Sequence, residues 1–192
     1  MEKNIVVLQA STKKDGNTAA LAGWFAEGAR RRGAAVEIIG VATLKFKANG
    51  CTSCRLCQSS PLYECAVKDG AAAVLAKMAS ADVIAMATPL YFFGPSAQLK
   101  LVLDRAFSLY KWDNAAGRFT TPLRGKLLVL IASAYEDVGL DALERPFRLT
   151  AEYTGMGFKS LLVPNAGVSG DIKDKSGPRE KAAALGEWAA RG

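Results

Sequence analysis

Five short and almost wholly apolar runs recur along the chain, and their length and spacing limit its fold more than any other feature. They occupy residues 4–10, 34–41, 82–88, 126–133 and 159–164. Runs of this length are typical of strands that are buried on both faces. The segments between and after them carry apolar residues at helical spacing, at 18–32, 70–79, 95–110, 140–153 and 178–191. Strands that alternate with helices favour a parallel sheet with right-handed crossovers.

The pattern predicts an α/β doubly wound, three-layer sandwich whose five-stranded parallel sheet has the strand order 2-1-3-4-5. We expect residues 1–192 to form a single domain, because the length suits one domain of roughly 100–200 residues and no linker interrupts the pattern. Residues 44–68 fit no strand or helix and are expected to form a cysteine-containing insertion. In this strand order, the ligand crevice lies where strands 1 and 3 end.

Composition excludes several classes of chemistry and of partner. The chain has no histidine, which excludes Ser-His-Asp triads, Cys-His dyads and HExxH zinc sites. Its net charge is +7, yet it carries no signature of a nucleic-acid-binding motif, and Arg30–Arg32 suits the C-terminal end of a helix. No apolar run approaches the roughly 20 residues that span a bilayer, and the first residues do not resemble a signal peptide. We therefore expect a cytoplasmic protein with no nucleic-acid or membrane partner.

The four cysteines, Cys51, Cys54, Cys57 and Cys65, lie close together in the sequence. In a cytosolic chain such clustering favours a metal or redox site over structural disulfides. The spacing C-x2-C-x2-C-x7-C is compatible with ligation of a [4Fe–4S] cluster. Zinc would have to use all four thiolates, since no imidazole is available. Redox-active thiols, or thiols packed in the core or in a dimer contact, fit the same residues, so these alternatives stay open.

Three loops that follow the first, third and fourth strands carry unusual residues. The first is Ser11–Thr18, where hydroxyls, an amide and a helix N-terminus converge, as a phosphate monoester requires. It is neither a Walker loop nor a GxGxxG loop, and a plain N-cap loop is the alternative. The second is Thr88–Pro95, whose three consecutive aromatic residues suit a flat ring, or else core or dimer packing. The third is Ser133–Glu136.

The segments STKKDGNT and ATPLYFFGPSAQLKLVLDR, with the cysteine segment between them, resemble the flavodoxin-like family of NAD(P)H-dependent FMN reductases, which includes iron–sulfur flavoproteins. The resemblance implies that FMN places its phosphate in the first loop, its ring against the second and its far edge near the third. The implied FMN-binding residues are Ser11, Lys13, Asn17, Thr18, Pro89, Leu90, Tyr91, Phe92, Phe93, Gly94, Ser133, Ala134 and Tyr135.

The function that this resemblance implies is an FMN-dependent oxidoreductase. Electrons would pass from NAD(P)H through bound FMN to a quinone, an azo or nitro compound, a flavin or a metal acceptor, with no side chain acting as catalyst. The alternative is an electron-transfer carrier with a [4Fe–4S] cluster on Cys51, Cys54, Cys57 and Cys65 and a redox protein as partner. A flavin-binding regulator is a third hypothesis. A homodimer or higher oligomer is implied, with Tyr63, Phe92, Phe93 and Trp112 as its contact residues.

Two positions depart from the family pattern: Asp15, and Asp69-Gly70, which stands where the family usually has paired acids after the fourth cysteine. Asp15 is an anion beside a proposed phosphate, so its side chain must point away or be offset by Lys13 and Lys14. Asp104-Arg105 matches the family and is interpreted as a surface pair that stabilises the helix and sheet edge.

Overall fold

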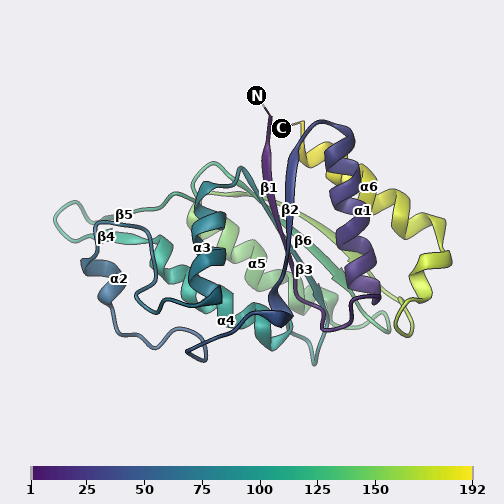
Figure 1. Cartoon of the computed structure of the whole chain (residues 1–192), viewed down its shortest axis with the longest axis horizontal. Helices are drawn as coiled ribbons and strands as arrows, with labels where there is room; N and C mark the ends of the chain where they lie inside the picture. Colours follow the sequence, from purple (N-terminus) through teal and green to yellow (C-terminus); the bar gives the residue numbers. More distant parts are fainter. Residues whose placement is uncertain (1, 192) are drawn as a thin grey trace.

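The computed structural model describes residues 2–191, which form an α/β sandwich of three layers (Figure 1). Its parallel sheet has the order β2-β1-β3-β6-β7, which confirms the predicted order of the five strands. The strands are β1 (Asn4–Gln9), β2 (Ala35–Gly40), β3 (Val83–Pro89), β6 (Leu127–Ser133) and β7 (Gly157–Val163). The helices are α1 (Asn17–Arg31), α2 (Leu56–Ser59), α3 (Gly70–Ser80), α4 (Ala97–Arg105), α5 (Leu140–Thr154) and α6 (Ser176–Ala189), with 3-10 turns at Val41–Thr43, Ala106–Leu109 and Asp171–Asp174.

Alternate residues of each central strand enter two separate cores. In β1, Ile5 and Val7 pack under α1 and α6, whereas Val6 and Leu8 pack under α3, α4 and α5. Side chains of a strand point alternately to the two faces of its sheet, so a continuous apolar strand feeds both layers at once. Figure 1 shows α1 and α6 on one side of the sheet and α3 and α4 on the other.

Helices α1 and α6 approach each other so closely that two glycines lie at their contact. A Cβ atom added at Gly28 would lie 2.0 Å from the carbonyl oxygen of Ala183, and one added at Gly186 would lie 2.0 Å from that of Phe25. Glycine disfavours a helix interior by roughly 0.5–1 kcal/mol relative to alanine. Its presence here is explained by the backbone-to-backbone packing of the two helices.

The structure corrects three boundaries. Helix α4 begins at Ala97 with Ser96 as its N-cap, not at Pro95, because the Ser96 side chain accepts the N–H of Leu99. It ends at Arg105 and not near residue 110, and α6 begins at Ser176, two positions before the expected start. Between α4 and β6 the chain also forms a hairpin of β4 (Lys111–Asp113) and β5 (Arg118–Thr120), which the sequence pattern did not predict.

The unpredicted hairpin is held by aromatic and polar contacts. Phe119 stacks on Tyr153 of α5 with ring centroids 5.2 Å apart. The side chain of Gln58, in the cysteine-containing insertion, donates to the carbonyl of Tyr110 and accepts the N–H of Trp112. The insertion therefore packs against the hairpin. Within residues 2–191, no helix has the length and apolar character needed to cross a membrane.

Candidate functional site

The three predicted loops meet in one crevice at the carboxyl ends of β1, β3 and β6, with a volume of about 300 Å³. Its lining includes Ser11, Lys13, Asn17 and Thr18 from the first loop, Pro89, Leu90 and Tyr91 from the second, and Ser133, Ala134 and Tyr135 from the third. Phe92, Phe93 and Gly94 do not line it. The crevice lies at the topological switch point, where a doubly wound sheet binds its ligands.

A fourth loop completes the crevice and was missed in the sequence. It follows β7 and contributes Ala166, Gly167, Val168 and Ser169. The available signal was a run of small residues directly after the last predicted strand, PNAGVSG, which has the same position relative to its strand as the other three loops. Loops that leave the same edge of a parallel sheet meet there.

Asn17 joins the first loop to this fourth loop. Its side-chain amide nitrogen donates to the carbonyls of Ala166 at 3.0 Å and Val168 at 2.9 Å, and its oxygen accepts the N–H of Gly170 at 2.8 Å. Asn17 is only 8% exposed. Its hydrogen-bonding groups are therefore used within the protein, so Asn17 shapes the crevice with its side chain and leaves its backbone N–H for a ligand.

The start of α1 presents free backbone donors to the crevice. Within residues 2–191, no acceptor bonds to the backbone N–H groups of Asn17, Thr18 and Ala19. This is expected, because the first N–H groups of a helix have no partner inside the helix. The buried hydroxyl of Thr18 pairs with that of Ser133 at 2.8 Å, which fixes the first loop to the third. A helix N-terminus with free N–H groups is suited to binding an anion.

Asp15 does not oppose an anion in the crevice. Its side chain is 94% exposed and lies 3.5 Å from the ammonium of Lys173. It is not among the lining residues, whereas Lys13 is. The positive end of the helix therefore faces the crevice without a competing carboxylate.

The aromatic segment forms a tight turn in a strained conformation. Tyr91 and Gly94 exchange two backbone hydrogen bonds, of 2.9 and 3.1 Å, around Phe92 and Phe93. Both phenylalanines have positive φ, 47° and 67°, which costs a residue with a side chain roughly 1–2 kcal/mol. The ring of Phe93 packs on Gly139, where an added Cβ would lie 2.3 Å from a ring carbon.

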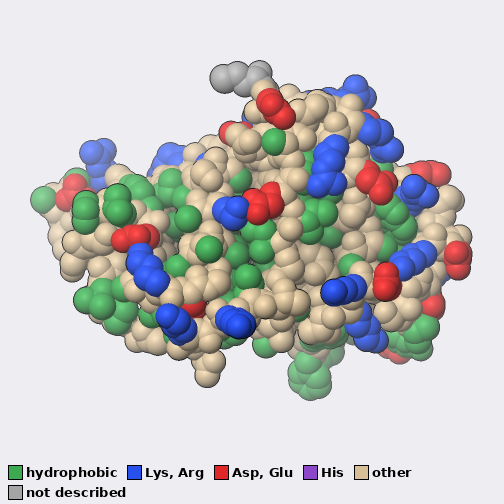
Figure 2. Space-filling view, viewed as in Figure 1, with side chains coloured by type: hydrophobic (Ala, Val, Ile, Leu, Met, Phe, Trp, Pro, Cys, Tyr) green, Lys and Arg blue, Asp and Glu red, His purple; other side chains and the backbone are tan. Residues whose placement is uncertain are grey.

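This turn stands out from the surface beside the crevice. The Phe92 side chain is 97% exposed, and Tyr91, Phe93 and Tyr135 are each at least half exposed. Figure 2 shows hydrophobic side chains that project from the lower edge of the molecule. The turn thus exposes apolar rings to solvent and keeps two residues at unfavourable positive φ. Backbone strain of this kind is often found at functional sites.

All four cysteines line a second hollow, which we call the cysteine hollow. Cys57 is buried and Cys65 partly buried, whereas Cys51 and Cys54 are exposed. Arg105 and Ser108 form part of the wall opposite the insertion. Throughout residues 2–191, no three His, Cys, Asp or Glu side chains converge tightly enough to hold a single metal ion. The hollow brings the thiols to one place without assembling a mononuclear site.

Arg105 lies in the protein interior, contrary to the expectation of a surface pair with Asp104. Asp104 pairs instead with Lys100 on the surface. Arg105 binds Asp69 at 2.7 Å, and both side chains are only 1% exposed. It also donates to the carbonyl of Val67 at 2.6 Å and to the sulfur of Cys65 at 3.4 Å. The sequence did not reveal this pair because its members are 36 residues apart.

The buried carboxylate of Asp69 predicts a loss of stability in acid. Burial raises its pKa, but the Arg105 hydrogen bond and the N–H groups of Lys47 and Ala72 outweigh burial and lower the pKa from 3.8 to about 2. The Asp69 carboxylate therefore binds a proton more weakly in the folded protein than in the unfolded chain. Its contribution to the free energy of unfolding is complete above about pH 4 and is lost as the pH falls towards 2. Across this window, urea unfolding should show that the wild type loses about 2 kcal/mol more than Asp69→Asn does. Parallel pH profiles for the two proteins would contradict this prediction.

Two buried polar atoms in the wall of the cysteine hollow have no hydrogen-bond partner. They are Nε of Arg105 and the hydroxyl of Ser108, and no other buried side-chain nitrogen or oxygen of residues 2–191 lacks one. Each such atom normally has a specific explanation, because unsatisfied buried donors are rare.

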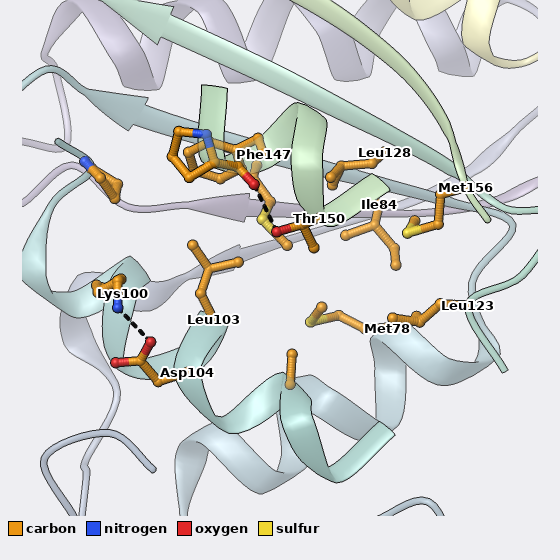
Figure 3. A pocket seen from close by; sticks show the side chains of 14 residues that line it. Met78, Ile84, Lys100, Leu103, Asp104, Leu123, Leu128, Phe147, Thr150 and Met156 are labelled. Carbon is orange, nitrogen blue, oxygen red and sulfur yellow. Dashed lines mark hydrogen bonds and ion pairs between the residues drawn. The ribbon is translucent and has the colours of Figure 1, made fainter. Parts of the chain in front are cut away.

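A third cavity, of about 190 Å³, lies between α3, α4, α5 and the sheet (Figure 3). Its lining is mostly apolar, with Met78, Leu103, Phe147 and Met156 among it. The hydroxyl of Thr150 is already bonded to the carbonyl of Pro146. The cavity shares no residue with the crevice, so it is separate from the crevice.

Comparison with known proteins agrees with this geometry. A curated iron–sulfur flavoprotein of Methanocaldococcus jannaschii is 31% identical over 102 residues, which cover 53% of this chain and 51% of that protein. The match thus spans about half the length of that relative. The fold resembles an NAD(P)H:quinone oxidoreductase from Methanothermobacter marburgensis, with a TM-score of 0.71 and 18% identity over 100% of this chain and 98% of that one.

A second solved structure is an FMN-dependent NADH-azoreductase from Bacillus anthracis in complex with FMN. Its TM-score is 0.72, at 12% identity over 98% of this chain and all of that one. At these identities, the two structures establish the fold. The family model described as NADPH-dependent FMN reductase matches residues 3–163, which is most of the sequence. The chain belongs to the family of NADPH-dependent FMN reductases.

Proposed function

We propose that the crevice binds FMN and that the chain, as one FMN-binding domain, catalyses electron transfer from NAD(P)H to a small acceptor. The observation that carries this proposal is the convergence of the loops after β1, β3, β6 and β7 around the N-terminus of α1. The crevice offers an anion site at one end and an aromatic turn at the other. FMN bound there would supply the redox chemistry, namely hydride acceptance from NAD(P)H and onward electron transfer, while the crevice would bind and orient it.

The phosphate end is formed by the first loop. The free N–H groups of Asn17, Thr18 and Ala19 would donate to phosphate oxygens, and Lys13 supplies a positive charge at the crevice wall. The Ser11 hydroxyl accepts the N–H of Lys13, which closes the loop on itself. The side chain of Asn17 positions this end and does not bind phosphate directly.

The ring end is formed by the second and third loops. Pro89, Leu90 and Tyr91 line the crevice there, opposite Ala134 and Tyr135. The N–H groups of Phe92 and Phe93 have no acceptor in the part of the chain that the structure describes, whereas that of Gly94 is used by Tyr91. These two donors directly follow the lining residue Tyr91, so they would bind acceptor atoms on the edge of a flavin ring only where that ring extends past the crevice towards the turn.

The acceptor is proposed to be a small planar compound such as a quinone or an azo compound. The exposed rings of Tyr91, Phe92 and Tyr135 provide flat apolar surface next to the proposed ring site. A second copy of the chain is proposed to cover part of it, because Trp112 and Phe93 are also about half exposed. Tyr63 is partly buried by its contacts with Thr120 and Lys111, so it is less suited to that interface. A cytoplasmic location stays a prediction.

Replacing Asn17 by alanine should weaken FMN binding by about tenfold or more. The change releases the fourth loop from the start of α1, and each lost buried hydrogen bond costs about 1 kcal/mol, where 1.4 kcal/mol is tenfold in affinity. Quenching of flavin fluorescence by the apoprotein measures the affinity. Riboflavin, which lacks the phosphate, should lose less affinity than FMN does.

The matched control for this test is Asp15→Asn. Asp15 is in the same loop but outside the crevice, so this variant should bind FMN as tightly as the wild type or slightly more tightly. Unchanged FMN affinity in Asn17→Ala would show that the side-chain bonds of Asn17 do not position the phosphate end of the crevice.

A second candidate function is electron transfer through a [4Fe–4S] cluster held by Cys51, Cys54, Cys57 and Cys65. The observation that favours it is the pair of unpartnered donors in the wall that these four thiols share. The number and kind of thiols match such a cluster, but within residues 2–191 they do not converge on one metal-binding site. The hollow itself holds only about 20 Å³, so loading requires the exposed segment 51–54 to move outward. Iron and sulfide analysis of anaerobically purified protein distinguishes this carrier from a flavin-only enzyme.

A further inference from the structure

The cavity between α3, α4, α5 and the sheet is lined mostly by buried apolar side chains (Figure 3). The lining residues that are at most 3% exposed are Met78, Ile84, Met86, Leu123, Leu128 and Phe147. Helix α4 packs against α3, whereas α5 packs against β6 and β7, so the mouth lies in the gap between α4 and α5. Protein interiors contain few voids larger than a water molecule, because atoms that line a void lose contact partners. A cavity of about 190 Å³ is therefore unfavourable until something apolar fills it.

Methionine is concentrated in this lining. The sequence has four methionines, and Met78, Met86 and Met156 all line the cavity. They come from three places, namely α3, β3 and the connection between α5 and β7. A methionine side chain is flexible and polarisable, so it adapts to ligands of different shape, and its sulfur makes favourable contacts with aromatic rings. Together with the ring of Phe147, these side chains favour a flat aromatic ligand.

The charges at the mouth of the cavity cancel. Lys100 and Asp104 are the charged residues of the lining, and they pair with each other on α4. An ion buried in the cavity would thus find no free charge of opposite sign, which is costly. The lining therefore favours an uncharged ligand, with any polar substituent placed at the mouth.

We propose that this cavity binds an uncharged, planar aromatic molecule of one or two rings. An engineered apolar cavity of about 150 Å³ binds benzene, so the larger volume here suits a slightly larger ring system such as indole. A helix of a partner protein, roughly 10 Å across, is too wide to enter. The cavity and the crevice share no lining residue, so binding of FMN at the crevice is not required.

The test uses indole as the probe and the full chain with isotope-labelled methionine methyl groups. Indole is titrated in the presence of excess FMN, so that it does not compete for the crevice, and the methyl signals are followed by nuclear magnetic resonance. An aromatic ring shifts the signals of groups that lie against its face, so Met78, Met86 and Met156 report occupancy of the cavity directly. We expect the three signals to shift together and to saturate at one indole per chain, with a Kd of about 1 mM or below.

Leu103→Phe and Leu101→Phe are a matched pair of variants for this titration. Leu103 lines the cavity from α4, and Figure 3 shows its side chain directed into it, so a phenylalanine there fills part of the space. Leu101 is on the same helix and is also partly buried, but it lies outside the lining. We expect Leu103→Phe to weaken indole binding about tenfold or more, and Leu101→Phe to bind indole as the wild type does.

The wild-type titration decides the matter even if Leu103→Phe does not fold. Methionine signals that stay unchanged at millimolar indole would overturn the proposal, and so would equal indole affinity in the two variants. Signals that shift with protein concentration and not with indole would show that a second copy of the chain covers the gap, which also overturns it. The affinity for FMN is measured separately by flavin fluorescence, so failure of either site is recognised on its own.

Discussion

Replacing Arg105 by methionine is expected to lower the free energy of unfolding near neutral pH by about 3–5 kcal/mol. Arg105 has the largest fully buried side chain among residues 2–191, and its removal leaves the carboxylate of Asp69 in the interior without a cation. An uncompensated buried charge is costly because the low dielectric of the interior cannot solvate it. Urea unfolding followed by circular dichroism measures the loss.

Two further variants separate the charge from the packing. Lys100→Met breaks the exposed pair with Asp104 on the same helix and should cost at most about 0.5 kcal/mol. The double variant Arg105→Met with Asp69→Asn should be more stable than Arg105→Met alone, because asparagine is neutral and still caps α3. If the free energy of unfolding of Arg105→Met lies within about 1 kcal/mol of that of the wild type, which is well below the expected cost, the buried pair is not a main source of stability.

The strand order and the crevice were predictable because their signals are local. Each buried strand is a continuous apolar run such as Val83–Thr88, and its length separates it from a helix. The order then follows from handed crossovers, and the order places the loops that follow β1, β3 and β6 at one edge. The hydroxyl pair of Thr18 and Ser133 confirms that loops 115 residues apart meet there.

Contacts between distant residues could not be predicted, because they leave no local pattern. From its own loop Asn17 is predicted to bind phosphate, yet its side chain donates to carbonyls 149 to 151 residues later. From its neighbour Asp104, Arg105 is predicted to lie on the surface, yet it is buried and pairs with Asp69. The hairpin of β4 and β5 has three residues in each strand, too few for an alternation to be visible.

Helix α4 connects the two regions of chemical interest. Its N-cap is Ser96, whose N–H donates to the hydroxyl of Thr88 just before the aromatic turn, and its last residue is Arg105 in the wall of the cysteine hollow. At 1.5 Å per residue, the two ends are roughly 14 Å apart. One rigid element therefore sets the separation between the proposed FMN ring site and the four thiols.

Replacing Gly28 by alanine is expected to lower the free energy of unfolding by about 3 kcal/mol, although alanine is the better helix former. The new methyl group would lie 2.0 Å from the carbonyl oxygen of Ala183, so α6 has to move away from α1. That movement opens the core that Phe25, Leu185 and Ala182 share beneath the two helices. Thermal or urea unfolding measures the loss.

Gly23→Ala is the matched control, since Gly23 is in the same helix and an added Cβ there meets no atom within 4 Å. It should raise stability by about 0.5–1 kcal/mol, because only the helix propensity changes. The two variants make the same chemical change in one helix and are expected to differ in sign. Because Gly186 faces the same contact, adding Gly186→Ala to Gly28→Ala should cost less than the sum of the single changes, once the helices have already separated. Equal effects at Gly23 and Gly28 would show that α1 and α6 adjust to the extra methyl group without loss of packing.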